Sequence, residues 1–238
     1  MSLALFLVGE LPTGDSCTLD GPEGHHAADV QRLRVGERLL LGDGVGGRAT
    51  AEVTAVGKGT LALSIIDRSY VRPPSPRIVV AQGIPKGDRG ELAVQAMTEV
   101  GVDGILPWAA LRCVSIWRGD RGVKARDKWA ATAREASKQA RRSFVPTVAP
   151  AAVTTAELAP RATFVLHEEA TAALSSAPLP TDGDIVLVVG PEGGISDEEV
   201  ATFTAAGALP VRLGENVLRT STAGVAATCV LATRLGRW

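Results

Sequence analysis

Over the first seventy residues, apolar positions fall in short runs that alternate with polar ones, a pattern typical of β-strands with one buried face. Two turn-forming stretches, LGDGVGG and GKG, separate the later runs. Glycine and aspartate favour turns because they tolerate backbone conformations that strands do not use. The pattern predicts a small barrel or sandwich, with strands at residues 3–8, 38–41, 49–56 and 61–67.

Beyond residue 76 the pattern changes to continuous apolar runs that alternate with longer helical segments. Apolar strands without polar alternation are buried on both faces, as in a parallel sheet with helices on each side. The sequence therefore predicts an α/β domain. Its expected strands are residues 77–82, 104–108, 163–167 and 185–190, and its expected helices are residues 88–100, residues 124–142 and two that begin near Asp197 and Thr220.

The stretch RSYVRPPSPR lies between the two patterns and has three prolines within residues 73–76. Proline cannot donate a backbone hydrogen bond, and proline-rich segments favour extended linkers over strands or helices. We therefore expect a β domain over residues 1–71, a linker over 72–76 and an α/β domain over 77–238.

A glycine-rich loop, GPEGG, joins a buried strand to a helix that opens with ISDEEV. Ser196 and Glu199 have the spacing of a capping box, so the helix begins there. Helix N-termini usually attract anions, but Asp197, Glu198 and Glu199 place carboxylates at this one, and Glu192 lies in the loop. The patterns GxxxxGK[ST] and GxGxxG are also missing. A ligand with a positive centre, such as S-adenosylmethionine, fits better than a phosphate; the alternative is a tight turn without a ligand.

A second stretch, VRLGENVLRTSTAGVAATCVLATRLG, has a short strand that meets Gly214 and a helix opened by Thr220, Ser221 and Thr222. Small side chains allow this helix to approach a neighbouring element or a cofactor closely; they are Ala223, Gly224, Ala226 and Ala227. A well-packed terminal helix with no ligand is the alternative for the helix body.

Charge is concentrated in one region of a chain whose net charge is only −1. Residues 118–142 contain nine Lys or Arg against three Asp or Glu, so the rest of the chain is acidic. At helical spacing the apolar residues Trp129, Ala133, Ala136 and Ala140 oppose a basic face formed by Arg134, Lys138, Arg141 and Arg142. Such a face is usually only solvated, but its surplus positive charge favours contact with nucleic-acid phosphates.

Several other classes of protein are excluded or disfavoured. No apolar run reaches the ~20 residues of a membrane span, and the three cysteines form no CxxC pair, which fits a reducing cytoplasm. HEEAT at His167 has only half of the HExxH zinc pattern, and the adjacent His25 and His26 have no third ligand nearby in sequence. We therefore expect a cytoplasmic protein with no metal site.

Five stretches together resemble the SPOUT class of methyltransferases, and within it the RsmE-type enzymes, which methylate N3 of a uridine in 16S ribosomal RNA. The resemblance covers nearly the whole chain, and the last two stretches carry its most specific motifs. The five are HHAADVQRLRVGERL with LGDG, QGIPKGDRGELAVQAMTEVGVDGILPW, REASKQARRSFVPTV, LVVGPEGGISDEE and LGENVLRTSTA. One position departs from the family pattern Leu-Arg-x-Glu-Thr-Ala: Ser221 stands where the family has the glutamate.

The resemblance implies a mostly parallel sheet with a C-terminal trefoil knot, an N-terminal PUA-like barrel that binds RNA, and a homodimer. It also implies S-adenosylmethionine as cofactor and the small ribosomal subunit as partner. The expected cofactor contacts are Leu166, His167, Val189, Gly190, Pro191, Glu192, Gly193, Gly194, Leu213, Gly214, Val217, Leu218, Arg219, Thr222 and Ala223. The expected RNA contacts are His26, Arg32, Arg34, Lys86, Arg134, Lys138, Arg141 and Arg142.

Methylation at N3 of uracil requires a weakly acidic imide proton to leave, so a cation beside the developing anion would stabilise the transition state. Arg219, between the two motif loops, is the expected catalytic residue. Glu192 is either a general base or an anchor of its loop. Two alternatives remain: a non-catalytic RNA-binding protein that keeps the fold, and a SPOUT enzyme that methylates a ribose or transfer RNA.

Overall fold

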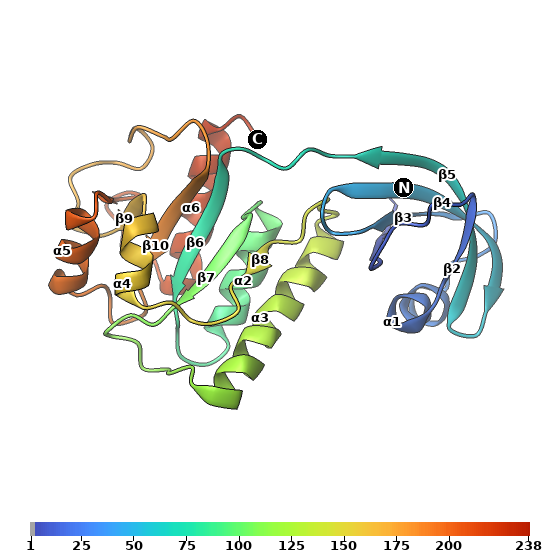
Figure 1. Ribbon diagram of the computed structural model, residues 1–238, viewed down its shortest axis with the longest axis horizontal. Coiled ribbons are helices and arrows are strands. Elements are labelled where there is room, and N and C mark those ends of the chain that lie inside the picture. Colours follow the sequence, from blue (N-terminus) through green and yellow to red (C-terminus); the bar gives the residue numbers. More distant parts are fainter. Residues whose placement is uncertain (1–2) are drawn as a thin grey trace. The chain divides into compact units, whose positions relative to one another are not determined.

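The computed structural model describes residues 3–238, and the chain divides into two compact units (Figure 1). The first unit comprises Met1–Pro73 together with Ser137–Val145, and the second comprises Pro74–Ala136 with Pro146–Trp238. The chain first passes from one unit to the other inside the proline-rich stretch. The sequence did not predict that a later segment, residues 137–145, would return to the first unit.

The first unit contains a five-stranded mixed sheet with the order β1-β3-β4-β5-β2. β1 pairs with β3 in parallel, and the other neighbours pair antiparallel. Alternate residues of β4 are buried, including Ala49, Ala51 and Val53, which produces the two-residue period seen in the sequence. The strands are β1 (Leu5–Leu7), β2 (Ser16–Leu19), β3 (Arg38–Gly42), β4 (Gly47–Gly57) and β5 (Thr60–Tyr70).

Three elements of this unit were not predicted from the sequence. β2 has the sequence SCTL, of which only Leu19 is buried, so it lacks an apolar signal. The short helix α1 (Gly21–His25) begins with Gly and Pro, a pair that is equally typical of a turn. A π-helical turn, η1 (His26–Val30), follows it directly.

The second unit is built on a six-stranded, all-parallel sheet with the order β11-β9-β10-β6-β7-β8. This confirms the predicted parallel sheet, and the four predicted strands correspond to β6, β7, β9 and β10. β8 and β11 are short and lie at the two edges. The strands are β6 (Arg77–Gly83), β7 (Gly104–Trp108), β8 (Thr147–Val148), β9 (Phe164–Leu166), β10 (Asp184–Val189) and β11 (Leu209–Val211).

Helices cover both faces of this sheet because successive side chains of a strand point to opposite sides. Ile78 and Val80 of β6 belong to a core with side chains from α2 (Arg89–Glu99), α3 (Gly119–Gln139) and α6 (Thr220–Arg234). Val79 and Ala81 belong to the opposite core, with side chains from α4 (Thr155–Leu158), η2 (Ala159–Arg161) and α5 (Asp197–Ala205). Figure 1 shows the two groups of helices on either side of β6 and β10.

The long basic helix, α3, begins and ends earlier than predicted. It starts at Gly119 and ends at Gln139, and Arg141 has a positive φ of 52°. That left-handed conformation is costly for a residue with a side chain and is incompatible with a continuing helix. Arg141 and Arg142 therefore follow the helix, and the prediction that they share a helical face with Arg134 and Lys138 is wrong.

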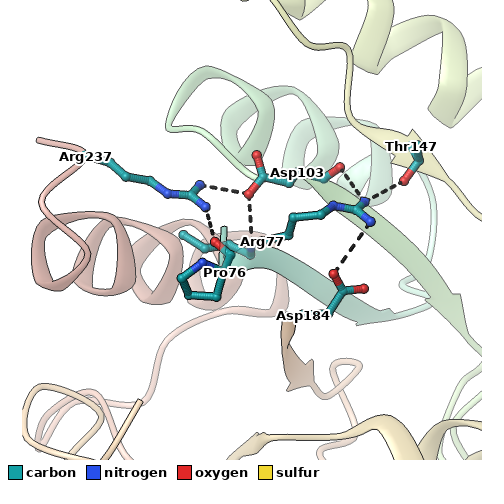
Figure 2. Close-up of polar contacts among 7 residues, drawn as sticks. Pro76, Arg77, Asp103, Thr147, Asp184 and Arg237 are labelled. Atoms are coloured by element: carbon teal, nitrogen blue, oxygen red, sulfur yellow. Dashed lines mark hydrogen bonds and ion pairs between the residues drawn. The ribbon is translucent and has the colours of Figure 1, made fainter. Parts of the chain in front are cut away.

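A polar network joins the C-terminal residues to the amino end of β6 (Figure 2). The carboxylate of Asp103, which is buried, accepts hydrogen bonds from the backbone N–H of Ile78 and from Arg237 Nη1, both at 2.8 Å. Arg237 also donates to the carbonyl of Pro76. Next to them, Arg77 lies 3.6 Å from the carboxylate of the more exposed Asp184. The segment after α6 is thus fastened beside the central strand of the sheet.

No helix among residues 3–238 is long and apolar enough to cross a membrane.

Candidate functional site

A cavity of about 680 Å³ lies in the second unit, where three neighbouring parallel strands end. Leu166 ends β9, Val189 ends β10 and Val211 ends β11, and all three line the cavity. Loops at the carboxyl ends of parallel strands are the usual place for a ligand in an α/β sheet. Two loops enclose the cavity: residues 190–195, which we call the glycine loop, and residues 213–219, which we call the arginine loop.

All but one of the predicted cofactor contacts line this cavity. The exception is Thr222, which is exposed in the first turn of α6. The structure adds lining residues that the sequence analysis did not select: Arg89, Arg112, Glu168, Glu169, Ile195, Asp197, Val211, Arg212, Asn216 and Thr220. Glu168, Ile195 and Thr220 directly follow predicted contacts and could have been included on that ground. Arg89 and Arg112 come from distant segments, so no local signal marks them.

The conformation of the glycine loop depends on two glycines, one within the loop and one in the strand that it packs against. Gly194 has a φ of 73°, and its N–H donates to the carbonyl of Pro191 at 2.9 Å, which closes a tight turn. Gly83, at the end of β6, lies against the loop: a Cβ atom there would be 2.6 Å from the backbone nitrogen of Pro191. The loop therefore packs backbone to backbone on the central strand.

Glu192 anchors the glycine loop from one side. Its Oε1 accepts a hydrogen bond from the backbone N–H of Lys86 at 3.1 Å and one from Arg89 Nη1 at 2.9 Å. Partial burial raises the pKa of Glu192, but hydrogen bonds from its own backbone, from Arg89 and from Lys86 outweigh it and hold the pKa below the ordinary 4.5. A carboxylate held ionised in this way is a poor general base at neutral pH, so the geometry favours the role of an anchor.

We expect the substitution Glu192→Gln to weaken binding of S-adenosylhomocysteine several-fold at pH 7, because a half-exposed ion pair of this kind contributes modestly. The folded-state pKa is depressed, so the anchoring is complete above pH 4.5 and is lost as the pH falls through the lowered value. Titration calorimetry from pH 7 downward should show the two proteins converging at acid pH. A constant ratio of dissociation constants down to that pH would contradict the anchoring role.

Arg112 makes a second set of contacts with the same loop. Its Nη1 donates to the carbonyl oxygens of Gly193 and Ile195, at 3.2 and 3.4 Å. Both carbonyls belong to the residues that follow Glu192 in the loop. The glycine loop is thus held by hydrogen bonds from Lys86, Arg89 and Arg112.

The helix that follows the glycine loop begins as predicted, with a capping box. Ser196 Oγ accepts from the N–H of Glu199 at 3.3 Å, and Glu199 Oε2 accepts from the N–H of Ser196 at 3.1 Å. Glu199 is buried, and its other oxygen accepts from the N–H of Leu111 at 2.8 Å. Of the three acids that open α5, only Asp197 lines the cavity. The acids that would face a bound phosphate are therefore Glu168, Glu169, Glu192 and Asp197, whereas Glu199 is turned into the protein.

The arginine loop leads into α6 with no acid in the first turn of that helix. Arg219 is the N-cap residue, its side chain makes no capping hydrogen bond, and it lines the cavity. The positive end of the α6 dipole and the guanidinium of Arg219 therefore lie together beside the cavity. Ser221, half-buried in the same turn, adds no opposing charge.

Comparison with known proteins identifies the chain. Residues 72–232 match the RNA methyltransferase domain family, and residues 19–66 match the RNA methyltransferase PUA domain. The ribosomal RNA small subunit methyltransferase E of Mycobacterium bovis is 44% identical and aligns over 100% of this chain and 94% of its own length. The chain belongs to the ribosomal RNA small subunit methyltransferase E family. The Bacillus subtilis member is 30% identical, over 91% of this chain and 88% of its own.

A solved structure of the same family shows the fold with its cofactor. The Neisseria gonorrhoeae ribosomal RNA small subunit methyltransferase E, bound to S-adenosylmethionine, superposes with a TM-score of 0.86 and 29% sequence identity. The superposition covers 98% of each chain. The mixed sheet of the first unit and the parallel sheet of the second are therefore the two domains of this family.

The predicted RNA contacts in the first unit lie around the π-helical turn η1. His26 is half-buried, and its Nε2 lies 3.0 Å from Gln31 Nε2. Arg32 and Arg34 are exposed, and Arg32 has a positive φ of 57°. The structure thus leaves two arginine side chains of this segment accessible to solvent, with the histidine partly covered beside them.

The predicted RNA contacts of the basic region differ in their exposure. Arg134 and Arg141 are exposed, and Arg142 is half-buried. Lys138 lies 3.0 Å from the carboxylate of Glu23 within the first unit, and its side chain is only 10% exposed. This largely covered ion pair argues against a phosphate contact by Lys138. Lys86 is exposed beside the glycine loop but does not line the cavity.

Within residues 3–238, no cluster of three or more His, Cys, Asp or Glu side chains is arranged to hold a metal ion.

Proposed function

We propose that this protein transfers a methyl group from S-adenosylmethionine to N3 of a uridine in the 16S RNA of the small ribosomal subunit. Membership of the family supports an S-adenosylmethionine-dependent ribosomal RNA methyltransferase. The observation that carries the proposal is the cavity enclosed by the glycine loop and the arginine loop, because nearly all cofactor contacts expected from the resemblance meet there.

The lining of the cavity fits S-adenosylmethionine chemically. The cofactor has a positive sulfonium, a zwitterionic amino-acid end and a flat adenine, and it supplies the methyl group. Acidic and basic side chains both line the cavity, and apolar ones lie between them; they are Glu168, Glu169, Glu192, Asp197, Arg89, Arg112, Arg212, Leu166, Leu213 and Val217. We assign the adenosine to the apolar side chains and to the backbone of the two loops, with Ala223 beside them.

Arg219 is the residue that we assign to transition-state stabilisation. Uracil N3 must lose its proton before or while it forms a bond to carbon, so negative charge develops on the imide. A guanidinium at the positive end of α6 lowers the free energy of that anion. The remaining acceleration comes from holding the base and the donor in line, after the target base has been turned out of its stack. Glu192 takes no part in the proton transfer, because it is engaged with Arg89 and Lys86.

The finer architecture also belongs to the proposal. We assign residues 1–71 to a PUA-like barrel that binds RNA through His26, Arg32 and Arg34, residues 72–76 to the linker, and residues 77–238 to a SPOUT domain with a trefoil knot around the cavity. Arg134, Arg141, Arg142 and Lys86 contribute further phosphate contacts.

We also propose a cytoplasmic homodimer, supported by exposed apolar side chains on the second unit, among them Leu111, Val114 and Ile116.

The test is transfer of labelled methyl groups to small-subunit RNA that lacks the modification, presented both as free RNA and as assembled subunits. Mapping the label should place it on N3 of a single uridine. Label on a ribose or on transfer RNA would contradict the assignment. Tight cofactor binding without transfer would favour a non-catalytic RNA-binding protein, an alternative that the serine at position 221 keeps relevant.

A further inference from the structure

Gln82 occupies a buried position behind the cavity. It lies near the carboxyl end of β6, a central strand of the parallel sheet, and its side chain has no exposed surface. It does not line the cavity, so it cannot touch a ligand bound there. Any effect of Gln82 on binding must pass through the residues that it contacts.

The side chain of Gln82 begins a chain of hydrogen bonds that ends in the glycine loop. Its Nε2 donates to Thr220 Oγ1 at 2.8 Å, and Thr220 Oγ1 donates to the carbonyl oxygen of Gly190 at 2.7 Å. The Thr220 hydroxyl has one proton, and the carbonyl of Gly190 can only accept. The direction of both bonds is therefore determined: the amide of Gln82 must be the donor. We call Gln82, Thr220 and Gly190 the relay.

The relay joins the two loops that enclose the cavity. Gly190 is the first residue of the glycine loop, and Thr220 directly follows Arg219 at the start of α6. These positions are 30 residues apart, and Gln82 is 138 residues from Thr220. Thr220 is buried to 6% exposure but still borders the cavity, so the relay joins the two loops at the wall of the cavity itself.

The amide of Gln82 has a feature that packing alone does not explain. Among the described residues its Oε1 has no hydrogen-bond partner, although it is buried. A buried acceptor without a partner is destabilising, and an apolar side chain of the same shape would avoid the problem. The glutamine therefore carries a cost to stability, which is offset by the hydrogen bonds that its Nε2 donates to Thr220 Oγ1 and, at 3.1 Å, to the carbonyl oxygen of Gly83.

We propose that Gln82 is a positioning residue that holds the glycine loop and the arginine loop at the separation required for the cofactor and for Arg219. The inference rests on the proposed function and deepens it. By fixing the rotamer of Thr220, Gln82 keeps the carbonyl of Gly190 turned toward α6 and keeps the backbone of Arg219 in place. Loss of the amide would let the loops separate.

The experiment compares the full-length protein with Gln82→Met, Thr220→Val and the double variant. Methionine and valine keep the shape of the original side chains and remove the hydrogen bonds. Titration calorimetry with S-adenosylhomocysteine should show a dissociation constant raised about tenfold in each single variant. The double variant should be no weaker than either single one, because the relay acts as a unit. Thr220→Ser keeps the hydroxyl, so its dissociation constant for S-adenosylhomocysteine should be close to that of the wild type.

Two further measurements separate positioning from stability. The urea midpoint of Gln82→Met should be unchanged or higher than that of the wild type, while the KM for the cofactor rises and kcat falls. Thr228→Val is the matched control: Thr228 is buried in the same helix, and its hydroxyl donates to the carbonyl of Gly224 at 2.7 Å, outside the relay. Its dissociation constant should equal that of the wild type.

Three results would overturn the relay. The first is wild-type affinity for S-adenosylhomocysteine in Gln82→Met, and the second is a loss of affinity in the double variant equal to the sum of the single losses. The third is a loss of affinity that appears only in variants whose urea midpoint is also lowered. Failure of the wild-type protein itself to bind S-adenosylhomocysteine would overturn the proposed function, and the relay with it.

Discussion

Replacing Arg219 by alanine is expected to lower kcat for methyl transfer by about 10²- to 10³-fold, the usual cost of removing one preorganised group that stabilises a developing anion. The guanidinium lies at the N-cap of α6, beside the cavity and without an acid in the first turn of the helix. Its effect is therefore on the charge that appears in the transition state. Cofactor affinity, measured by calorimetry with S-adenosylhomocysteine, should change much less than kcat.

Two comparisons sharpen this prediction. Arg219→Lys keeps a positive charge and should retain more activity than alanine. Arg212→Ala removes another exposed arginine that lines the same cavity from the end of β11, and its effect should be on affinity. The alanine variant at 219 should recover activity as the pH rises, because the imide of uracil then ionises without help. If kcat were unchanged and only KM increased, Arg219 would be a binding residue.

Replacing Arg237 by alanine is expected to destabilise the protein by about 3 kcal/mol, the usual cost of breaking a buried ion pair by removing one partner. The substitution removes the guanidinium that lies 2.8 Å from the nearly buried carboxylate of Asp103, and also the donor to the carbonyl of Pro76 (Figure 2). Urea unfolding monitored by tryptophan fluorescence would measure the change.

Asp184→Asn is the matched control for Arg237→Ala. Asp184 belongs to the same end of the sheet, but it lies 3.6 Å from Arg77, and both side chains are at least one-third exposed (34% and 40%). Pairs of this kind contribute ~1 kcal/mol or less, so the urea midpoint should barely move. Equal effects of the two substitutions would show that burial of Asp103 does not matter. An unchanged midpoint in Arg237→Ala would contradict a fastening role for the C-terminal segment.

The elements with strong local signals were predicted well. β7 spans Gly104–Trp108 as expected, because its apolar run has clear ends, and α5 begins at Asp197, because Ser196 and Glu199 satisfy each other's backbone. Elements without such signals were missed. β2 is an edge strand with one buried residue, and β8 has only two residues. Their pairing depends on a neighbouring strand and not on their own composition.

The basic region shows the limit of reasoning from charge. Its surplus of Lys and Arg is a property of the sequence, but the state of each side chain is not. Lys138 pairs with Glu23, which is 115 residues away, and the two side chains are only 10% and 15% exposed. Arg141 follows the helix because its backbone is left-handed. A charge count cannot distinguish a paired lysine from a solvated one, because the partner lies far away along the chain.

The sequence by itself determined the two motif loops, the start of each helix that follows them, the parallel sheet and the family. The loops, helix starts and strands depend on preferences for burial, capping and turns, which act within a few residues, and the family rests on the resemblance of the quoted motifs. Only the tertiary structure decided that the two loops enclose one cavity, that Arg89 and Arg112 reach it, and that Gln82 stands behind it. The reason is the order of the strands, which places β9, β10 and β11 near one another and brings together residues that no local preference links.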